Sequence, residues 1–148
     1  VQSALVSAYD FMPTLLDYLD LPLPESGNLP GKSFSGLLRE NGGPTHDSVV
    51  VYDEYGPTRM IRTRDWKYVH RYPDGPNELY DLSNDPDERR SLVGKSSEAG
   101  RVAEMREKLE EWFREYAAPE LDGRHQPVSG SGQLARLGTG EGPEFTQL

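Results

Sequence analysis

The sequence predicts an α+β fold in which a small antiparallel sheet of three to four strands is covered by one long amphipathic C-terminal helix. Two observations support this prediction. Short segments rich in β-branched and aromatic residues follow one another between residues 48 and 82, separated by turn residues. One segment with apolar residues at helical spacing comes after them. A further helix is expected before the strands.

That first helix is predicted over Asp10–Leu21, where apolar residues recur at helical spacing. We expect the Asp10 side chain to cap the first turn by accepting from free backbone NH groups. Pro13 falls within that turn, where a missing NH costs little. A loop rich in proline and glycine follows, and Ser33 is expected to cap a short helix over residues 34–39.

The strands are predicted from short apolar runs and from alternation along the chain. In the third strand, one face is expected to carry aromatic side chains together with His70. Residues 74–77 (DGPN) are typical of a turn, so the last strand should return antiparallel. The predicted strands are Ser48–Tyr55, Arg59–Thr63, Trp66–Tyr72 and Glu78–Leu82.

The long helix is predicted over Ser97–Tyr116, with Pro119 stopping it. Its apolar residues form one stripe, which favours packing across the sheet over a membrane or partner helix. The stripe consists of Val102, Met105, Leu109, Trp112, Phe113 and Tyr116. Residues 119–148 then form a tail rich in glycine and serine, which buries too little apolar surface to fold alone. The tail is predicted to be disordered or to lie as an extended arm on another surface, such as a neighbouring subunit.

Composition excludes several classes of function. The formal net charge of −9 argues against nucleic acid as a partner and gives no attraction to anionic lipid. No apolar run approaches the roughly 18–20 residues that span a bilayer. The sequence has no cysteine, so it offers no disulfide, no thiolate zinc site and no cysteine nucleophile. It begins with Val1, which suggests a piece of a longer protein.

Motifs that could carry chemistry have plainer interpretations. Residues 30–33 (PGKS) lack the glycine spacing and the preceding strand of a phosphate-binding loop. An acidic cluster does not match a calcium loop and is better interpreted as solvated turn carboxylates. Three arginines could bind an anion such as sulfate, although surface ion pairs are the favoured interpretation. The cluster is Asp81, Asp85, Asp87 and Glu88, and the arginines are Arg59, Arg62 and Arg71.

The three histidines, His46, His70 and His125, are too scattered to form a local metal motif. His70 stands at the end of a predicted strand, beside a turn, where scaffolds often present functional groups. Its aromatic neighbours equally suit a hydrogen-bonded packing residue. From the residues alone, the chain has no self-contained catalytic or metal site, and His70 is the single candidate for a site role.

Several segments occur together in an order that resembles the C-terminal region of one family. Ser7–Leu16 (SAYDFMPTLL) comes first, followed by Leu21-Pro22 and then Gly31–Phe34 (GKSF). The strand pair then carries RMIRT and WKY, and Glu78–Leu82 (ELYDL) precedes Asn84-Asp85-Pro86 and Glu88. The ordered set resembles the sulfatase family, the arylsulfatase-like hydrolases of the alkaline phosphatase-like superfamily.

The resemblance implies that residues 1–44 form the C-terminal edge of an α/β catalytic domain and residues 45–118 the family's C-terminal subdomain. It also implies that the parent hydrolyses sulfate esters, using calcium and a formylglycine made from the cysteine or serine of a C/S-x-P-x-R motif. No position here matches those groups, so the chain is expected to hold no cofactor and to partner a missing N-terminal sulfatase domain.

Two roles follow from that expectation. The subdomain is expected to pack on the catalytic domain and to help shape the substrate entrance, with His70 as a substrate-binding residue. The apolar face of the first helix should then lack a partner within this chain. The alternative is an independent, non-catalytic binding or interaction module.

Overall fold

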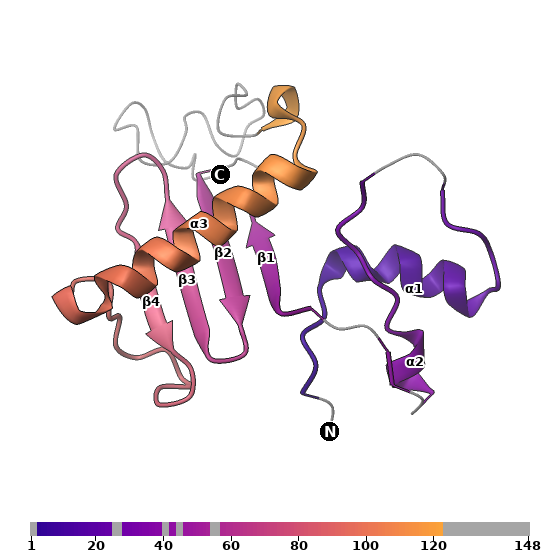
Figure 1. Ribbon diagram of the computed structural model, residues 1–148, viewed down its shortest axis with the longest axis horizontal. Coiled ribbons are helices and arrows are strands. Elements are labelled where there is room, and N and C mark those ends of the chain that lie inside the picture. The colour runs from indigo at the N-terminus through magenta and orange to yellow at the C-terminus, as the bar shows by residue number, and fades with distance from the viewer. Residues whose placement is uncertain (1–2, 25–27, 40–41, 44–45, 54–56, 123–148) are drawn as a thin grey trace, which may run out of the picture. The chain divides into compact units, whose positions relative to one another are not determined.

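The computed structural model describes residues 3–24, 28–39, 42–43, 46–53 and 57–122 of the 148-residue chain. The chain divides into two compact units, Val1–Val49 and Val50–Leu148. Figure 1 shows the first unit with its two helices and the second with a sheet and one long helix. The predicted boundaries at residues 44 and 118 stay predictions.

In the first unit, a single 3-10 turn (η1, Ala8–Asp10) leads directly into helix α1, Phe11–Tyr18. The helix ends before the predicted Leu21 because Asp20 adopts the left-handed conformation, with φ of 54°. The cap also differs from the prediction. The Asp10 carboxylate accepts from the backbone NH of Ser7, which precedes it, so it closes the 3-10 turn and not the first turn of α1.

The short helix α2 spans Ser35–Leu38. It is shorter than the predicted helix over residues 34–39, and its N-cap is Phe34, not the predicted Ser33. The Ser33 hydroxyl lies one residue earlier and accepts from the backbone NH of Ser35 at 3.2 Å. The hydroxyls of Ser33 and Ser35 both donate to the carboxylate of Asp17 on α1. These two hydrogen bonds stabilise the ionised form and hold the pKa of Asp17 below its usual value. They tie the loop after the prolines to α1.

Apart from Ser48 and Val49, which begin the first strand, the second unit holds an antiparallel meander, as the alternation of its residues predicts. The four strands lie in the order β1-β2-β3-β4 (Figure 1). Ile61 lies opposite Tyr68, which in turn lies opposite Leu79, so the three side chains form a row across one face. The strands are β1 Ser48–Tyr52, β2 Thr58–Thr63, β3 Trp66–Arg71 and β4 Glu78–Asp81.

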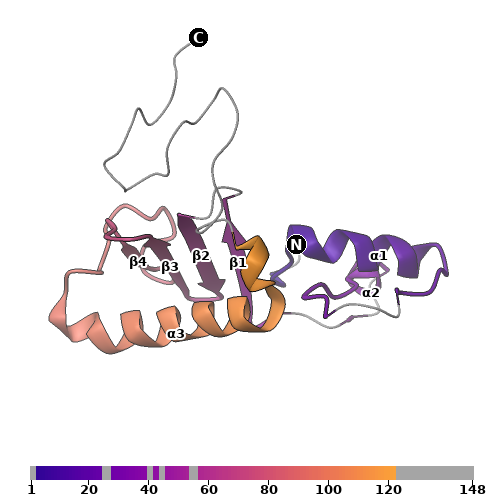
Figure 2. The ribbon, with the colours of Figure 1, turned by 90° about the horizontal axis from the view of Figure 1, so that it is seen from above.

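Helix α3, Ala99–Tyr116, follows a 3-10 turn (η2, Ser96–Glu98) and lies across one face of the sheet (Figures 1 and 2). Its predicted apolar stripe supplies the helical half of the core, which confirms that the helix packs on the sheet. A helix whose apolar stripe is covered in this way owes most of its stability to tertiary packing. The buried core consists of Val50, Ile61, Tyr68, Leu79, Met105, Leu109 and Phe113.

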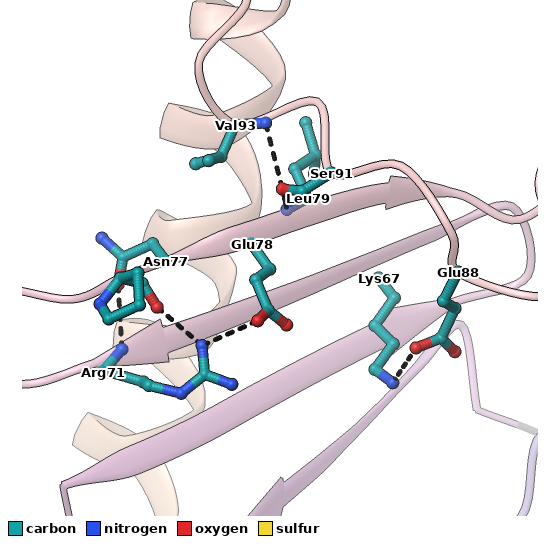
Figure 3. A network of polar contacts seen from close by, with 9 residues as sticks. Lys67, Arg71, Asn77, Glu78, Leu79, Glu88, Ser91 and Val93 are labelled. Carbon is teal, nitrogen blue, oxygen red and sulfur yellow. Dashed lines mark hydrogen bonds and ion pairs between the residues drawn. The ribbon is translucent and has the colours of Figure 1, made fainter.

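The segment between β4 and α3 covers the outer edge of β4. The Ser91 hydroxyl accepts from the backbone NH of Leu79 at 3.2 Å, and the backbone NH of Leu92 donates to the Leu79 carbonyl at 2.7 Å. Figure 3 shows this segment beside β4, with Ser91 next to Leu79. An edge strand whose backbone NH and carbonyl groups are hydrogen-bonded in this way cannot act as a template for pairing with another chain.

After α3, a 3-10 turn (η3, Pro119–Leu121) begins at the proline that was predicted to stop the helix. Asp122 is the last described residue, so the prediction of an extended or disordered tail concerns residues that lie mostly outside the described part. Among the described residues, no helix has the length and apolar character needed to cross a membrane.

Candidate functional site

His70 lies on β3, on the face of the sheet that α3 covers, and its side chain is 4% exposed. Its Nδ1 is 2.7 Å from the Tyr68 hydroxyl, and its ring contacts the ring of Tyr72 at a centroid distance of 4.2 Å. Burial raises the pKa of Tyr68, so its hydroxyl stays protonated. The hydrogen bond between the Tyr68 hydroxyl and Nδ1 fixes the orientation of the imidazole ring.

Arg59 on β2 lies directly opposite His70 in the register of the sheet, and its side chain is 2% exposed. The guanidinium carbon is 3.5 Å from the centroid of the Phe113 ring and 5.4 Å from that of the Tyr72 ring. An aromatic face attracts a cation, and the attraction is stronger where water is excluded. The two rings therefore hold the guanidinium beside the buried histidine.

The charge of Arg59 is balanced by Asp122, whose Oδ1 lies 2.5 Å from Nη2. Two further nitrogens of the guanidinium, Nε and Nη1, are buried and have no hydrogen-bond partner among the described residues. An unpaired buried donor costs about 1–3 kcal/mol, so two on one side chain are unusual. We call Arg59, Tyr72, Phe113 and Asp122 the Arg59 cluster.

The Arg59 cluster corrects the favoured interpretation of this arginine, because its ion pair is buried and not at the surface. The burial of Arg59 could have been predicted from the sequence. Arg59 and Ile61 are two positions apart on one strand, so their side chains share its apolar face. Arg71 follows the original interpretation, since it pairs with Glu78 at 3.2 Å on the half-exposed face (Figure 3). Arg62 is exposed.

A second buried polar group lies in the first unit. The Asp10 carboxylate is 1% exposed, and its Oδ1 lies 2.7 Å from Nε2 of His46 and accepts from the backbone NH of Lys32 at 2.9 Å. The ring of Tyr9 contacts the edge of His46. With the bond from Ser7, the carboxylate joins three segments of the unit. Its donors are mostly backbone groups, which suits a structural role.

The acidic cluster forms turn hydrogen bonds and ion pairs, as the plainer interpretation predicts. The Asp81 carboxylate accepts from the backbone NH of Ser83 and of Asn84, and Glu88 pairs with Lys67 on β3 (Figure 3). Backbone NH groups of the following arginines, Arg89 and Arg90, hold the pKa of Asp85 below its usual value. Within the described part of the chain, no group of three histidine, cysteine, aspartate or glutamate side chains is placed to hold a metal ion.

Comparison with known proteins places the chain in a family. Residues 1–115 match the family model described as N-sulphoglucosamine sulphohydrolase, C-terminal. That match covers more than half of the 148 residues. The chain therefore belongs to the family of sulfatase C-terminal domains, which confirms the resemblance of its ordered motifs.

Curated relatives are sulfatases. The chain is 34% identical over 110 residues to human arylsulfatase K, a match that covers 65% of this chain and 20% of the relative. It is 31% identical over 125 residues to the N-acetylglucosamine-6-O-sulfatase of Bacteroides thetaiotaomicron, covering 77% of this chain and 22% of that protein. The chain thus spans about a fifth of the length of these relatives.

Solved structures share the fold. One, determined in complex with its substrate D-glucosamine-2-N,6-O-disulfate, matches with a TM-score of 0.64 at 29% identity, over 79% of this chain and 25% of that one. The phosphonate monoester hydrolase of Agrobacterium radiobacter matches with a TM-score of 0.59 at 29% identity, over 74% and 25% of the two chains.

The family implies calcium and formylglycine, and neither the sequence motif for formylglycine nor a calcium site is found, the latter among the described residues. The sequence contains no cysteine and no S-x-P-x-R segment from which formylglycine is made. The carboxylates that gather in space, those of the acidic cluster, accept from neighbouring backbone groups or pair with basic side chains. Each of the two buried charged groups described above, the Arg59 cluster and the Asp10 carboxylate, has one carboxylate, whereas calcium requires several convergent oxygen ligands.

Proposed function

We propose that this chain is the C-terminal part of a larger sulfatase that hydrolyses sulfate esters, and that it has no catalytic centre of its own. The observation that carries the proposal is the family match over residues 1–115. It is supported by the sequence, which has no C/S-x-P-x-R segment, and by the described residues, among which no three potential ligand side chains gather to hold a metal ion. The chemistry then belongs to an N-terminal catalytic domain, which supplies the nucleophile and the metal. This chain contributes packing surface and part of the substrate entrance.

The first unit supports packing against that catalytic domain. Apolar side chains along α1 and the following loop are between 40% and 66% exposed. Large apolar side chains exposed together on one helix and the loop after it are typical of an interface. An independent binding module would be expected to cover such residues, so their exposure favours a docked subdomain. They are Phe11, Met12, Leu15, Tyr18, Leu19, Leu21 and Leu23.

A contribution to the substrate entrance rests on the position of His70 and stays a proposal. An imidazole can donate a hydrogen bond to an oxygen of a sulfated substrate, if the entrance lies at this end of β3. Its burial at 4% and its bond to Tyr68 equally stabilise the sheet. Substrate contact and packing therefore have to be separated by measurement.

We expect His70→Ala, introduced into the full-length protein, to raise KM for a sulfate ester if the imidazole contacts substrate. The reason is that a contact made equally in the ground state and the transition state affects binding and leaves kcat unchanged. The measurement pairs steady-state kinetics with the melting temperature. A fall of several degrees in the melting temperature with unaltered kinetics would assign His70 to packing alone.

Tyr68→Phe is the matched variant for that experiment. It keeps the buried ring and removes only the hydroxyl that bonds Nδ1 of His70. If the hydroxyl orients the imidazole toward substrate, this variant raises KM in the same direction as His70→Ala. A KM equal to that of the unchanged protein would show that the orientation of the ring does not matter for binding.

A further inference from the structure

The buried guanidinium of Arg59 has more hydrogen-bonding capacity than its surroundings use. A guanidinium presents five NH groups in a fixed planar arrangement that matches the oxygens of a carboxylate or sulfate. Asp122 uses one nitrogen, Nη2, through one oxygen. The other two nitrogens, Nε and Nη1, have no acceptor in the described part of the chain. An oxyanion that reached two nitrogens at once would satisfy donors that Asp122 leaves unpaired.

The position of Asp122 makes its carboxylate replaceable. It directly follows the three-residue turn η3, where its own NH donates to the Pro119 carbonyl at 3.3 Å. Arg59, in contrast, is fixed by the sheet and by the ring of Phe113 on α3. The cation therefore lies on a rigid element, while its counter-ion lies on a short segment beyond the helix.

We propose that Arg59 is a binding site for an oxyanion, a carboxylate or a sulfate group, and that Asp122 occupies it as an internal ligand. An arriving oxyanion takes the place of the Asp122 carboxylate on the guanidinium, so the buried charge stays balanced throughout the exchange. Phe113 and Tyr72 keep the guanidinium plane in position while this happens. The site is a property of this chain and goes beyond the proposed function, so it does not depend on the activity of the parent protein.

The test removes the internal ligand. Asp122→Asn leaves the Arg59 guanidinium buried without its counter-ion, and added sulfate or acetate should restore the charge balance at this site. We expect Asp122→Asn in the 148-residue chain to bind inorganic sulfate at least about tenfold more tightly than the unchanged chain, because a tethered carboxylate competes at an effective concentration of about millimolar or above. The measurements are the melting temperature against anion concentration and the NMR signal of the Arg59 Nε–H, at constant ionic strength.

Two controls make the result specific. Glu107→Gln removes a carboxylate from an exposed ion pair with Arg114 and should leave the anion response unchanged. Asp122→Asn combined with Arg59→Met should abolish the response while keeping an apolar side chain under Phe113. Equal responses in Asp122→Asn and Glu107→Gln, or a response that survives the loss of Arg59, would overturn the proposal.

If Asp122→Asn does not fold, the unchanged chain still gives an answer. Sulfate should shift the Arg59 Nε–H signal in a saturable way, at concentrations that leave the signal of exposed Arg114 unaffected. Comparing sulfate with acetate then shows which of the two oxyanions the site prefers. No shift at the highest concentration that leaves the fold intact would also overturn the proposal.

Discussion

Leu109→Ala is expected to lower the free energy of unfolding of the Val50–Leu148 unit by about 2–5 kcal/mol. Leu109 is 0% exposed and lies in the core where α3 crosses the sheet. Removing its side chain loses transfer free energy and leaves a cavity that rigid neighbours cannot fill. Urea unfolding, followed by tryptophan fluorescence, measures the loss, since Trp66 and Trp112 both border this core.

Glu107→Ala is the control for that change. Glu107 lies on the same helix, and its side chain is 66% exposed in an ion pair with Arg114. Exposed ion pairs contribute between about 0 and 1 kcal/mol, so little stability should be lost. If Leu109→Ala costs no more than Glu107→Ala, α3 does not pack on the sheet as described.

Asp10→Ala should produce the second large effect, a fall of about 2–4 kcal/mol in the free energy of unfolding of the first unit. The carboxylate accepts from the backbone NH groups of Ser7 and Lys32 and pairs with His46. Each donor left unpaired costs about 1–3 kcal/mol when it is buried, and less where water can reach it. Amide hydrogen exchange in the 148-residue chain should show faster exchange at Lys32 and in α1.

Asp47→Ala, an exposed carboxylate next to His46, provides the comparison and should leave exchange unchanged. The combination of Asp10→Ala with His46→Ala should cost less than the sum of the two single changes, because both remove the same contact. Strict additivity would mean that the pair between Asp10 and His46 contributes nothing to the unit.

The second unit could be predicted almost completely from the sequence because its pattern is local. Alternation in β2 and β3 fixes which side chains face α3, and the stripe from Val102 to Tyr116 fixes which face of the helix meets them. The ends of the elements were predicted less well. Backbone geometry decides where an element ends. In the first unit, for example, Asp20 adopts the left-handed conformation and α1 ends before the predicted Leu21.

The polar groups could not be predicted in the same way. Arg59 and Asp122 are 63 positions apart, and Asp10 and His46 are 36 apart. No local pattern links such positions, because only the folded chain brings them together. The burial of Arg59 could have been inferred from its alternation with Ile61, but the two unpaired nitrogens could not.

A comparison of sulfate-ester hydrolysis by the 148-residue chain and by the full-length protein tests the central claim most directly. Both are assayed with the same aryl sulfate, with calcium and with a chelator. We predict calcium-dependent turnover by the full-length protein and none by the chain alone. The sequence lacks the C/S-x-P-x-R segment that gives the nucleophile, and its described residues hold no cluster of metal-binding side chains. Metal-dependent turnover by the chain alone, or no sulfatase activity in the full-length protein, would contradict the proposed function.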